Sequence, residues 1–375
     1  MTVQELGLVP FLDLRPTTEA VRARVLARWA EVLDSSAFVN GAAVAEFEQR
    51  FAAACSATHA VSTANGTDAL HLVLRALGVG TGDEVVVPAN TFVATVEAVV
   101  LAGATPRFAD VEPDTLLMSA ATLEAATTSR TRVAVAVHLY GQLADMAAVR
   151  ATTDRLGVAL VEDAAQAHGA TSAGRPAGSF GAAGCFSFYP GKNLGAFGDG
   201  GAVVTSDDGL AARVRAMRDH GRTPGAHYVH ERLGFNSRLD TLQAVVLDEK
   251  LSLLPRWNDE RRRLVERYRA RLDPQVAPLV AEPPGGRGAH HLAVVQVRER
   301  DEVRRALAEQ GVATGIHYPV PCHLLPPYAS YARGPLPVAE RAANRIMSLP
   351  LFPGMTLEQA DLVADRVNTV AGVLR

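Results

Sequence analysis

Short apolar segments alternate with longer helical segments through the first two thirds of the chain, and this alternation limits the possible folds most strongly. Near-continuous runs of valine, alanine and leucine are typical of strands in sheets covered on both faces. The sequence therefore predicts an α/β protein with a mostly parallel central sheet and helices on both faces. The predicted strands are 59–64, 84–89, 106–111, 132–138, 158–163, 185–189 and 201–206.

The pattern changes after this region. A long amphipathic helix is predicted from Asp240 to Arg271, with a kink at Pro255, and a strand is predicted at 290–297. A chain of 375 residues is also long for one hydrophobic core. We therefore expect a large domain at 1–250 and a smaller C-terminal α+β domain at 251–375.

Composition argues against several classes of function. The net charge is −3 and the isoelectric point is near 6.4, so nothing favours a nucleic-acid or anionic-membrane partner. Neither a membrane span nor a signal peptide is predicted. Cys55, Cys185 and Cys322 lack metal-ligand spacing, so no metal site is expected, and an odd, sparse set suits a reducing compartment. We expect a cytoplasmic protein.

Lysine is rare in this chain. Of 37 basic residues, only Lys192 and Lys250 are lysines. Arginine keeps its proton near neutral pH and cannot form an imine, whereas a lysine can act as a nucleophile. Lys250 follows two acidic residues and is predicted on the polar side of a helix. We therefore ascribe the presence of a lysine at this position to chance and expect no chemical role for it. Lys192 lies in the glycine-bounded segment 187–195, which predicts a tight turn that points its side chain into a cleft.

Two further segments carry groups that a phosphate-bearing cofactor needs. Gly66 and Thr67 lie between a strand and a helix, where a close backbone approach and a hydroxyl suit a phosphate, although such turns are common. Asp163 ends an apolar strand and is either a partner for a protonated ring nitrogen or a helix cap. Gln166 follows at a spacing that could reach a ring substituent, and Ser187 could add a phosphate hydroxyl.

The order of these segments is more specific than any one of them. A phosphate turn, an acid at a strand end, a lysine 29 positions later and a glycine cluster match the fold-type I enzymes of pyridoxal 5′-phosphate (PLP). In detail the chain resembles the sugar aminotransferases of the DegT/DnrJ/EryC1/StrS family along nearly its whole length. The matching stretches include NGTDAL, PANTFVAT, HLYGQ, EDAAQAHGA, SFYPGKNLGAFGDGGAVVT, GFNSRLDTLQAVVL and HYPVPCHL.

The resemblance implies a role for each matching position. Lys192 would form the Schiff base with PLP, and Asp163 would pair with the ring nitrogen. Phe92 would stack on the ring, although a core position on a helix is the alternative. Asn236 would reach the phosphate of the neighbouring subunit, which implies a homodimer with shared active sites. The remaining implied cofactor contacts are Gln166 to the phenolate oxygen and Gly66, Thr67 and Ser187 to the phosphate.

The resemblance also implies a substrate class. The lysine loop, with HLYGQ and HYPVPCHL, looks like that of enzymes that aminate C3 of dTDP-linked 3-keto-6-deoxyhexoses, with L-glutamate as the amine donor. Amination at C4, a PLP-binding regulator and an aminobenzoate-type synthase are the alternatives. The sugar dehydratases of the family replace the lysine by histidine, so Lys192 favours transamination. Candidate substrate contacts are Tyr189, His317, Tyr318 and His323, and packing within the loop is the alternative for the two histidines.

Overall fold

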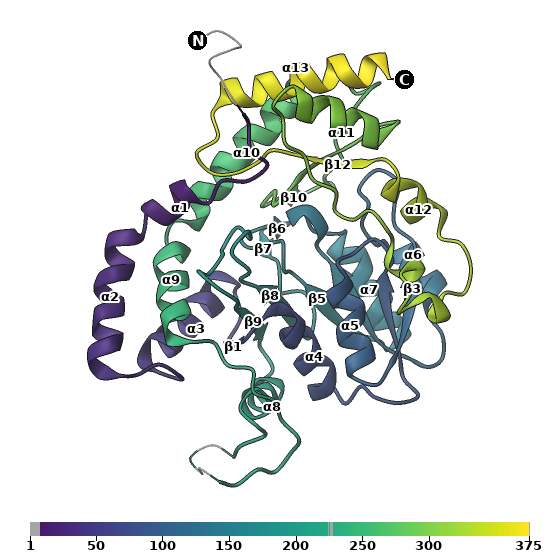
Figure 1. Cartoon of the computed structure of the whole chain (residues 1–375). Helices are drawn as coiled ribbons and strands as arrows, with labels where there is room; N and C mark the ends of the chain where they lie inside the picture. The colour runs from purple at the N-terminus through teal and green to yellow at the C-terminus, as the bar shows by residue number, and fades with distance from the viewer. Residues whose placement is uncertain (1–7, 224, 226–227, 375) are drawn as a thin grey trace.

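The computed structural model describes residues 8–223, 225 and 228–374. Its centre is a seven-stranded sheet with the strand order β1-β9-β8-β5-β4-β2-β3 (Figure 1). Only β9 runs antiparallel to its neighbours in this sheet, so the predicted mostly parallel sheet is confirmed. The strands are β1 (His59–Thr63), β2 (Glu84–Pro88), β3 (Thr105–Ala109), β4 (Thr131–Val137), β5 (Ala159–Asp163), β8 (Ala183–Ser187) and β9 (Gly201–Thr205).

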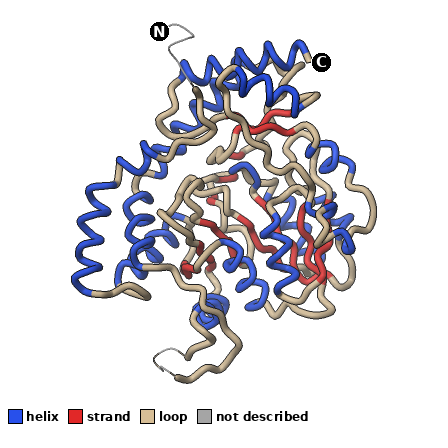
Figure 2. The backbone as a smooth tube through the Cα atoms, in the orientation of Figure 1, coloured by secondary structure: helices blue, strands red, loops and turns tan. Residues whose placement is uncertain are grey.

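Helices enclose this sheet, as Figure 2 shows. Local signals set their ends: Asn65 caps the helix that follows β1 with its side chain, and Gly157 ends another helix in the left-handed conformation. The helices are α1 (Arg15–Glu19), α2 (Arg22–Ser35), α3 (Ala42–Ala54), α4 (Gly66–Ala76), α5 (Val93–Leu101), α6 (Ala120–Ala126), α7 (Met146–Leu156), α8 (Asp208–Arg218) and α9 (Thr241–Leu251).

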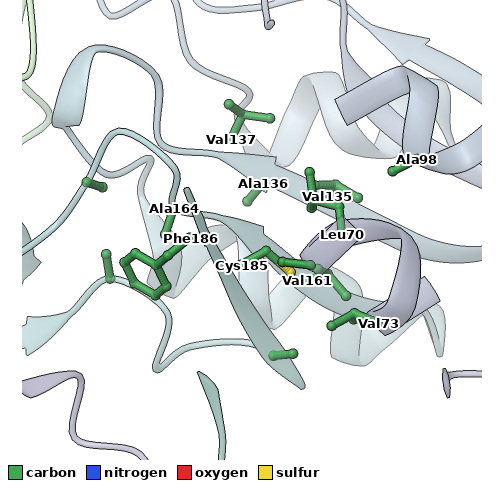
Figure 3. Close-up of a cluster of buried hydrophobic side chains, with 14 of the residues drawn as sticks. Leu70, Val73, Ala98, Val135, Ala136, Val137, Val161, Ala164, Cys185 and Phe186 are labelled. Carbon is green, nitrogen blue, oxygen red and sulfur yellow. The ribbon is translucent and has the colours of Figure 1, made fainter. Parts of the chain in front are cut away.

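The largest hydrophobic core of the described residues joins the seven-stranded sheet to the helices around it, and α4 contributes much of it. Figure 3 shows Leu70 and Val73 of α4 close to Val135 of β4 and Val161 of β5. Each of these side chains is at most 3% exposed. Burial of one such side chain stabilises the fold by about 1.5–3 kcal/mol. Together with the contacts of α4 with β8 and β9, this packing fixes the start of α4 relative to the sheet.

The C-terminal part of the chain builds a second core. It contains β11 (Ala293–Gln296) and β12 (Ile346–Leu349), which pair antiparallel, and residues from the helices beside them. Val9, near the start of the described chain, belongs to this core. The division at residue 250 stays a prediction. The helices here are α10 (Leu254–Arg271), α11 (Arg300–Glu309), α12 (Pro337–Ala343) and α13 (Leu357–Val373).

Short elements complete the fold. A small three-stranded sheet has the order β10-β6-β7. In the loops that the structure describes there are three single turns of 3₁₀ helix. The bounds are β6 (Thr171–Ser172), β7 (Arg175–Pro176), β10 (Gly286–Arg287), η1 (Leu139–Gly141), η2 (Cys322–Leu324) and η3 (Ala329–Tyr331). Within the described part of the chain, no helix has the length and apolar character that a membrane span requires.

The region predicted as one kinked helix is two helices. The helix α9 ends at Leu251 and α10 begins at Leu254, so Pro255 lies in the first turn of α10. A proline there removes an N–H that has no partner within the helix, so it begins a new helix instead of bending a continuous one. The position predicted for Lys250 was also wrong. Its side chain is buried, because α9 packs against α2 and α3 and also contacts the Lys192 loop.

Candidate active site

A cavity of about 600 Å³ opens beyond the carboxyl ends of β4, β5 and β8, where ligands bind in parallel sheets. It is lined by residues that are far apart in the sequence, from Phe11 to Leu351. Two of the predicted site residues, Asn236 and His323, do not line it. The predicted site residues that do are Gly66, Thr67, Phe92, Asp163, Gln166, Ser187, Tyr189, Lys192, His317 and Tyr318.

One end of the cavity has the properties of a phosphate cradle. The first residue of α4 is Gly66, and a Cβ atom built there would lie 2.6 Å from Cβ of Ser187. Only glycine therefore lets the helix start approach Ser187 so closely. The N-terminus of α4 presents unpaired backbone N–H groups beside the hydroxyls of Thr67 and Ser187, a combination that suits an anion. Asn65 caps α4 by accepting a 2.8 Å hydrogen bond from the Asp68 N–H.

A buried carboxylate lies at the end of β5. Oδ2 of Asp163 accepts a 2.7 Å hydrogen bond from the Thr95 hydroxyl, and Oδ1 accepts a 3.2 Å bond from the Ala165 N–H. The Thr95 oxygen in turn lies 2.8 Å from that of Thr91. Turns follow Asp163 in place of a helix, so the helix-cap alternative does not hold. The two hydrogen bonds fix the orientation of a carboxylate that faces the cavity.

Lys192 brings a primary amine to the cavity. Its backbone N–H donates a 2.9 Å hydrogen bond to the Tyr189 carbonyl, which closes the turn that carries it. Burial lowers the pKa of the Lys192 amine to about 8, while the charge of Asp163 acts in the opposite direction. Among the described residues, none accepts a hydrogen bond from this amine. A partly deprotonated, unpaired amine facing a cavity is poised for nucleophilic chemistry.

Gln166 and Tyr318 form a second polar group in the cavity. Oε1 of Gln166 accepts a 2.6 Å hydrogen bond from the Tyr140 N–H, and its Nε2 donates to the Tyr318 hydroxyl at 3.3 Å. The Tyr140 hydroxyl donates a 2.9 Å hydrogen bond to the His317 carbonyl. Burial lowers the pKa of His317 to about 4, with a further contribution from Lys192. The imidazole is therefore neutral at neutral pH.

Phe92 is placed to cover a flat ligand. It precedes α5, its side chain is 51% exposed, and its ring centroid lies 5.4 Å from that of Tyr318. A half-exposed ring at a cavity wall is not a core residue, so the core alternative does not hold. Between Phe92, the amine of Lys192 and the Asp163 carboxylate, the cavity offers an aromatic face, a nucleophile and an acid to one planar molecule.

Residues 19–368 match the model of the DegT/DnrJ/EryC1/StrS aminotransferase family. The chain belongs to this family. This assignment agrees with the resemblance predicted from the motifs, and it confirms that the protein is an aminotransferase.

Individual relatives resemble the chain over nearly their whole length. The dTDP-3-amino-3,4,6-trideoxy-alpha-D-glucose transaminase of Streptomyces venezuelae is 46% identical over 364 residues, 96% of this chain and 95% of that protein. The pleiotropic regulatory protein of Geobacillus stearothermophilus is 43% identical over 364 residues, 96% of this chain and 97% of that protein. The crystal structure of S. venezuelae DesV in complex with a ketimine intermediate has a TM-score of 0.94 at 46% identity, covering 97% of this chain and 99% of that chain.

Three of the predicted residues lie at or beyond the edge of the cavity of this aminotransferase. Tyr189 lines the cavity but is 59% exposed. Asn236 is exposed and lies in the segment between α8 and α9, bridged to Asp219. His323 is 1% exposed, with Nε2 3.1 Å from Oε1 of Glu340, so it packs within the loop.

The motifs of this family member did not point to every residue around the cavity. Thr95 and Tyr140 lie within the stretches PANTFVAT and HLYGQ and contact the predicted groups, but no role was predicted for them. His291 and Arg261 of α10 line the cavity and lie outside the matching stretches. A signal for Thr95 was present, because Thr91 and Thr95 are four residues apart at the start of an otherwise apolar segment. No comparable signal marks Arg261, which lies among several arginines in the same helix.

Proposed function

We propose that this protein transfers an amino group from L-glutamate to C3 of a dTDP-linked 3-keto-6-deoxyhexose, in the biosynthesis of a deoxyaminosugar. The cofactor is PLP, which alternates with its amine form. When bound, PLP acts as an electron sink and carries the amino group between donor and acceptor. The observation that carries the proposal is that the unpaired Lys192 amine, the Asp163 carboxylate and the anion cradle face one cavity.

The described residues fit the cofactor. The cradle of Gly66, Thr67 and Ser187 would hold its phosphate, where a side chain in place of Gly66 would collide with Ser187. Asp163 would hold the proton on the ring nitrogen, and Gln166 would contact the phenolate oxygen. Lys192 would bind the cofactor covalently through Nζ. Phe92 would exclude water from one face of the ring.

Lys192 also has the properties of the acid and base that transamination requires. An amine with a pKa of about 8 exchanges protons readily at neutral pH, whereas an ordinary lysine amine stays protonated. Its Nζ would remove a proton from the carbon that bears the donor nitrogen and return one during amination of the ketone. Glutamate would leave as 2-oxoglutarate, and the ketosugar would leave as the aminosugar.

A buried arginine supports a carboxylic acid as the amine donor. Arg261 is 3% exposed and donates a 2.9 Å hydrogen bond to the Leu351 carbonyl. No carboxylate of the described residues lies within 4 Å of its guanidinium. Burial lowers its pKa to about 10, so it remains a cation at neutral pH. A buried cation that lines a substrate cavity without an acidic partner would bind a carboxylate group strongly.

The position of Asn236 supports a homodimer with shared active sites. Asn236 lies outside the cavity of its own chain, in a segment that extends away from the sheet (Figure 1). Tyr228 and Leu233 in the same segment are 92% and 70% exposed. Apolar side chains that protrude in this way are typical of a surface that a second subunit covers. In the dimer, Asn236 would contact the cofactor phosphate of the partner.

The decisive experiment measures turnover of a panel of ketosugar substrates. The purified protein is incubated with glutamate and either dTDP-linked 3-keto- or 4-keto-6-deoxyhexoses, and the aminosugar is measured by mass spectrometry. We expect turnover of the 3-keto sugar. Efficient turnover of the 4-keto isomer alone would make the C3 assignment wrong and leave the aminotransferase assignment intact. The name of the Geobacillus relative favours a regulator as the second candidate, and cofactor binding without turnover of any ketosugar would support it.

A further inference from the structure

The loop that carries Lys192 is closed by contacts on both sides. The Ala196 N–H donates a 2.8 Å hydrogen bond to the Phe188 carbonyl, so residues 188 and 196 meet. Within this loop, Gly195 lies so close to Pro190 that a Cβ atom built on it would be 2.3 Å from the Pro190 carbonyl oxygen. The loop is therefore a compact unit, and whatever fixes its second half also fixes Lys192.

Two residues of α9 hold that second half. Oε1 of Gln243 accepts a 2.8 Å hydrogen bond from the Phe197 N–H. Nζ of Lys250 donates a 2.7 Å hydrogen bond to the Gly195 carbonyl. Gln243 and Lys250 are seven residues apart, so they lie two turns apart on one face of α9. This face of α9 therefore holds the loop that carries Lys192 in place.

The surroundings of Lys250 are unusual for a lysine. Its side chain is 5% exposed, and Nζ lies 4.5 Å from the centroid of the Phe197 ring. Among the described residues, no carboxylate lies within 4 Å of this ammonium. A buried cation without an acidic partner is unfavourable, and a methionine of similar length would fill the space without that penalty. Packing alone therefore does not account for an amine at this position.

We infer that Lys250 is a positioning residue, which fixes the Gly195 end of the loop and thereby holds the Lys192 amine in the cavity. The inference rests on the proposed function of Lys192. The Gly195 carbonyl points into a region that α9 fills, so it needs a donor from α9. A slender lysine side chain supplies one N–H group there, with the Phe197 ring stabilising its charge. The two lysines of the chain thus have complementary roles: Lys192 reacts, and Lys250 holds the loop that carries Lys192.

The test compares Lys250→Met with wild type, both as holoenzyme and after removal of the cofactor. Methionine keeps the length of the side chain and removes the hydrogen bond. A loosened loop exposes the Lys192 amine to water, which weakens the effect of burial on it. We expect the pH midpoint at which Lys192 reacts with acetic anhydride to rise by roughly one unit, measured by mass spectrometry on cofactor-depleted protein. We also expect the pH midpoint of the cofactor absorbance of the holoenzyme to change. The chain has only two lysines, so each labelled peptide is assigned directly.

The neighbouring residue offers a matched control. Asp248 is also 5% exposed and on α9, but its carboxylate pairs with Arg28 and Arg50 of α2 and α3 instead of the loop. Asp248→Asn should lower the melting temperature and leave both midpoints of Lys192 unchanged. Equal midpoints in Lys250→Met and wild type, or equal changes in both variants, would overturn the inference. If Lys250→Met does not fold, Lys250→Leu, which also lacks a donor, is measured in its place.

The same experiment separates this inference from the proposed function. A wild-type protein that binds no PLP would remove the proposed function, and the absorbance titration with it. The labelling titration of Lys192 would still report whether Lys250 sets the environment of that amine.

Discussion

The hydroxyl of Thr95 donates a 2.7 Å hydrogen bond to Oδ2 of Asp163, and this contact joins the start of α5 to the end of β5. Both residues are buried: Thr95 is 1% exposed and Asp163 is 7% exposed. A buried carboxylate with a fixed partner keeps one orientation, which is what a residue that faces a cofactor ring requires. The relationship also suggests how to separate the charge of Asp163 from its orientation.

We predict that Asp163→Asn binds PLP but loses turnover by a factor of about 10² or more, as expected when a preorganised electrostatic partner is removed. Thr95→Val keeps the carboxylate and the hydrogen bond from Ala165 and removes one of the two bonds that orient it, so its loss should be smaller, about tenfold. Turnover with glutamate and cofactor content by absorbance are measured for both. Near-normal turnover of Asp163→Asn would show that the carboxylate has no catalytic role.

A second prediction concerns the two lysines. Borohydride reduction of the holoenzyme should fix the cofactor to Lys192, because its amine faces the cavity while the Lys250 amine is bonded to the Gly195 carbonyl. Peptide mass spectrometry identifies the modified residue. Lys192→Ala should abolish turnover, since the same amine moves the proton. An adduct on Lys250 would contradict the assignment of roles.

The elements of the fold and the order of the site residues could be predicted because they depend on local pattern. Apolar runs mark buried strands such as β5, and the residue that ends such a strand, here Asp163, reaches the ligand edge of the sheet. The position of Gly66 at the start of α4 follows from the same kind of reasoning. These features are decided within a few residues of sequence.

The parts that could not be predicted depend on contacts between distant segments. Lys250 follows Asp248 and Glu249, which suggested a solvated face, but arginines of α2 and α3 pair with these acids and let the helix be buried. His323 shares a contact with Glu340, seventeen residues away, and so packs within its loop. Pairing of charges across elements leaves no periodic trace in one sequence.

A third prediction tests the donor. Arg261→Met should raise the KM for glutamate by at least tenfold and change the KM for the ketosugar little, because a charge-assisted hydrogen bond to a carboxylate is lost. The arginine also bonds to backbone carbonyls, so the variant will be less stable, and comparison of the two KM values in one preparation removes that effect. Equal increases in both KM values would mean that Arg261 acts only on the fold.

The proposed sharing of active sites between two subunits gives a fourth prediction. Asn236→Ala and Lys192→Ala are made in separate chains and exchanged into mixed dimers. If Asn236 acts on the partner, each mixed dimer contains one site with both residues intact, and random exchange restores about a quarter of wild-type activity in a symmetric dimer. If Asn236 acts within its own chain, both sites remain defective and no activity returns. Native mass spectrometry confirms that the subunits exchanged.

The last prediction concerns the stability of the fold at acidic pH. His168 is 1% exposed between the rings of Phe186 and Phe188, and burial lowers its pKa from 6.5 to about 3. Between these two values the unfolded chain binds a proton at this site and the folded chain does not. The free energy of unfolding therefore falls as the pH falls through this window, by about 1.4 kcal/mol per pH unit for one such group. In urea titrations from pH 7 to 4.5, His168→Leu should lose this part of the slope. The same slope in His168→Leu and wild type would show that this histidine is not neutral in the fold.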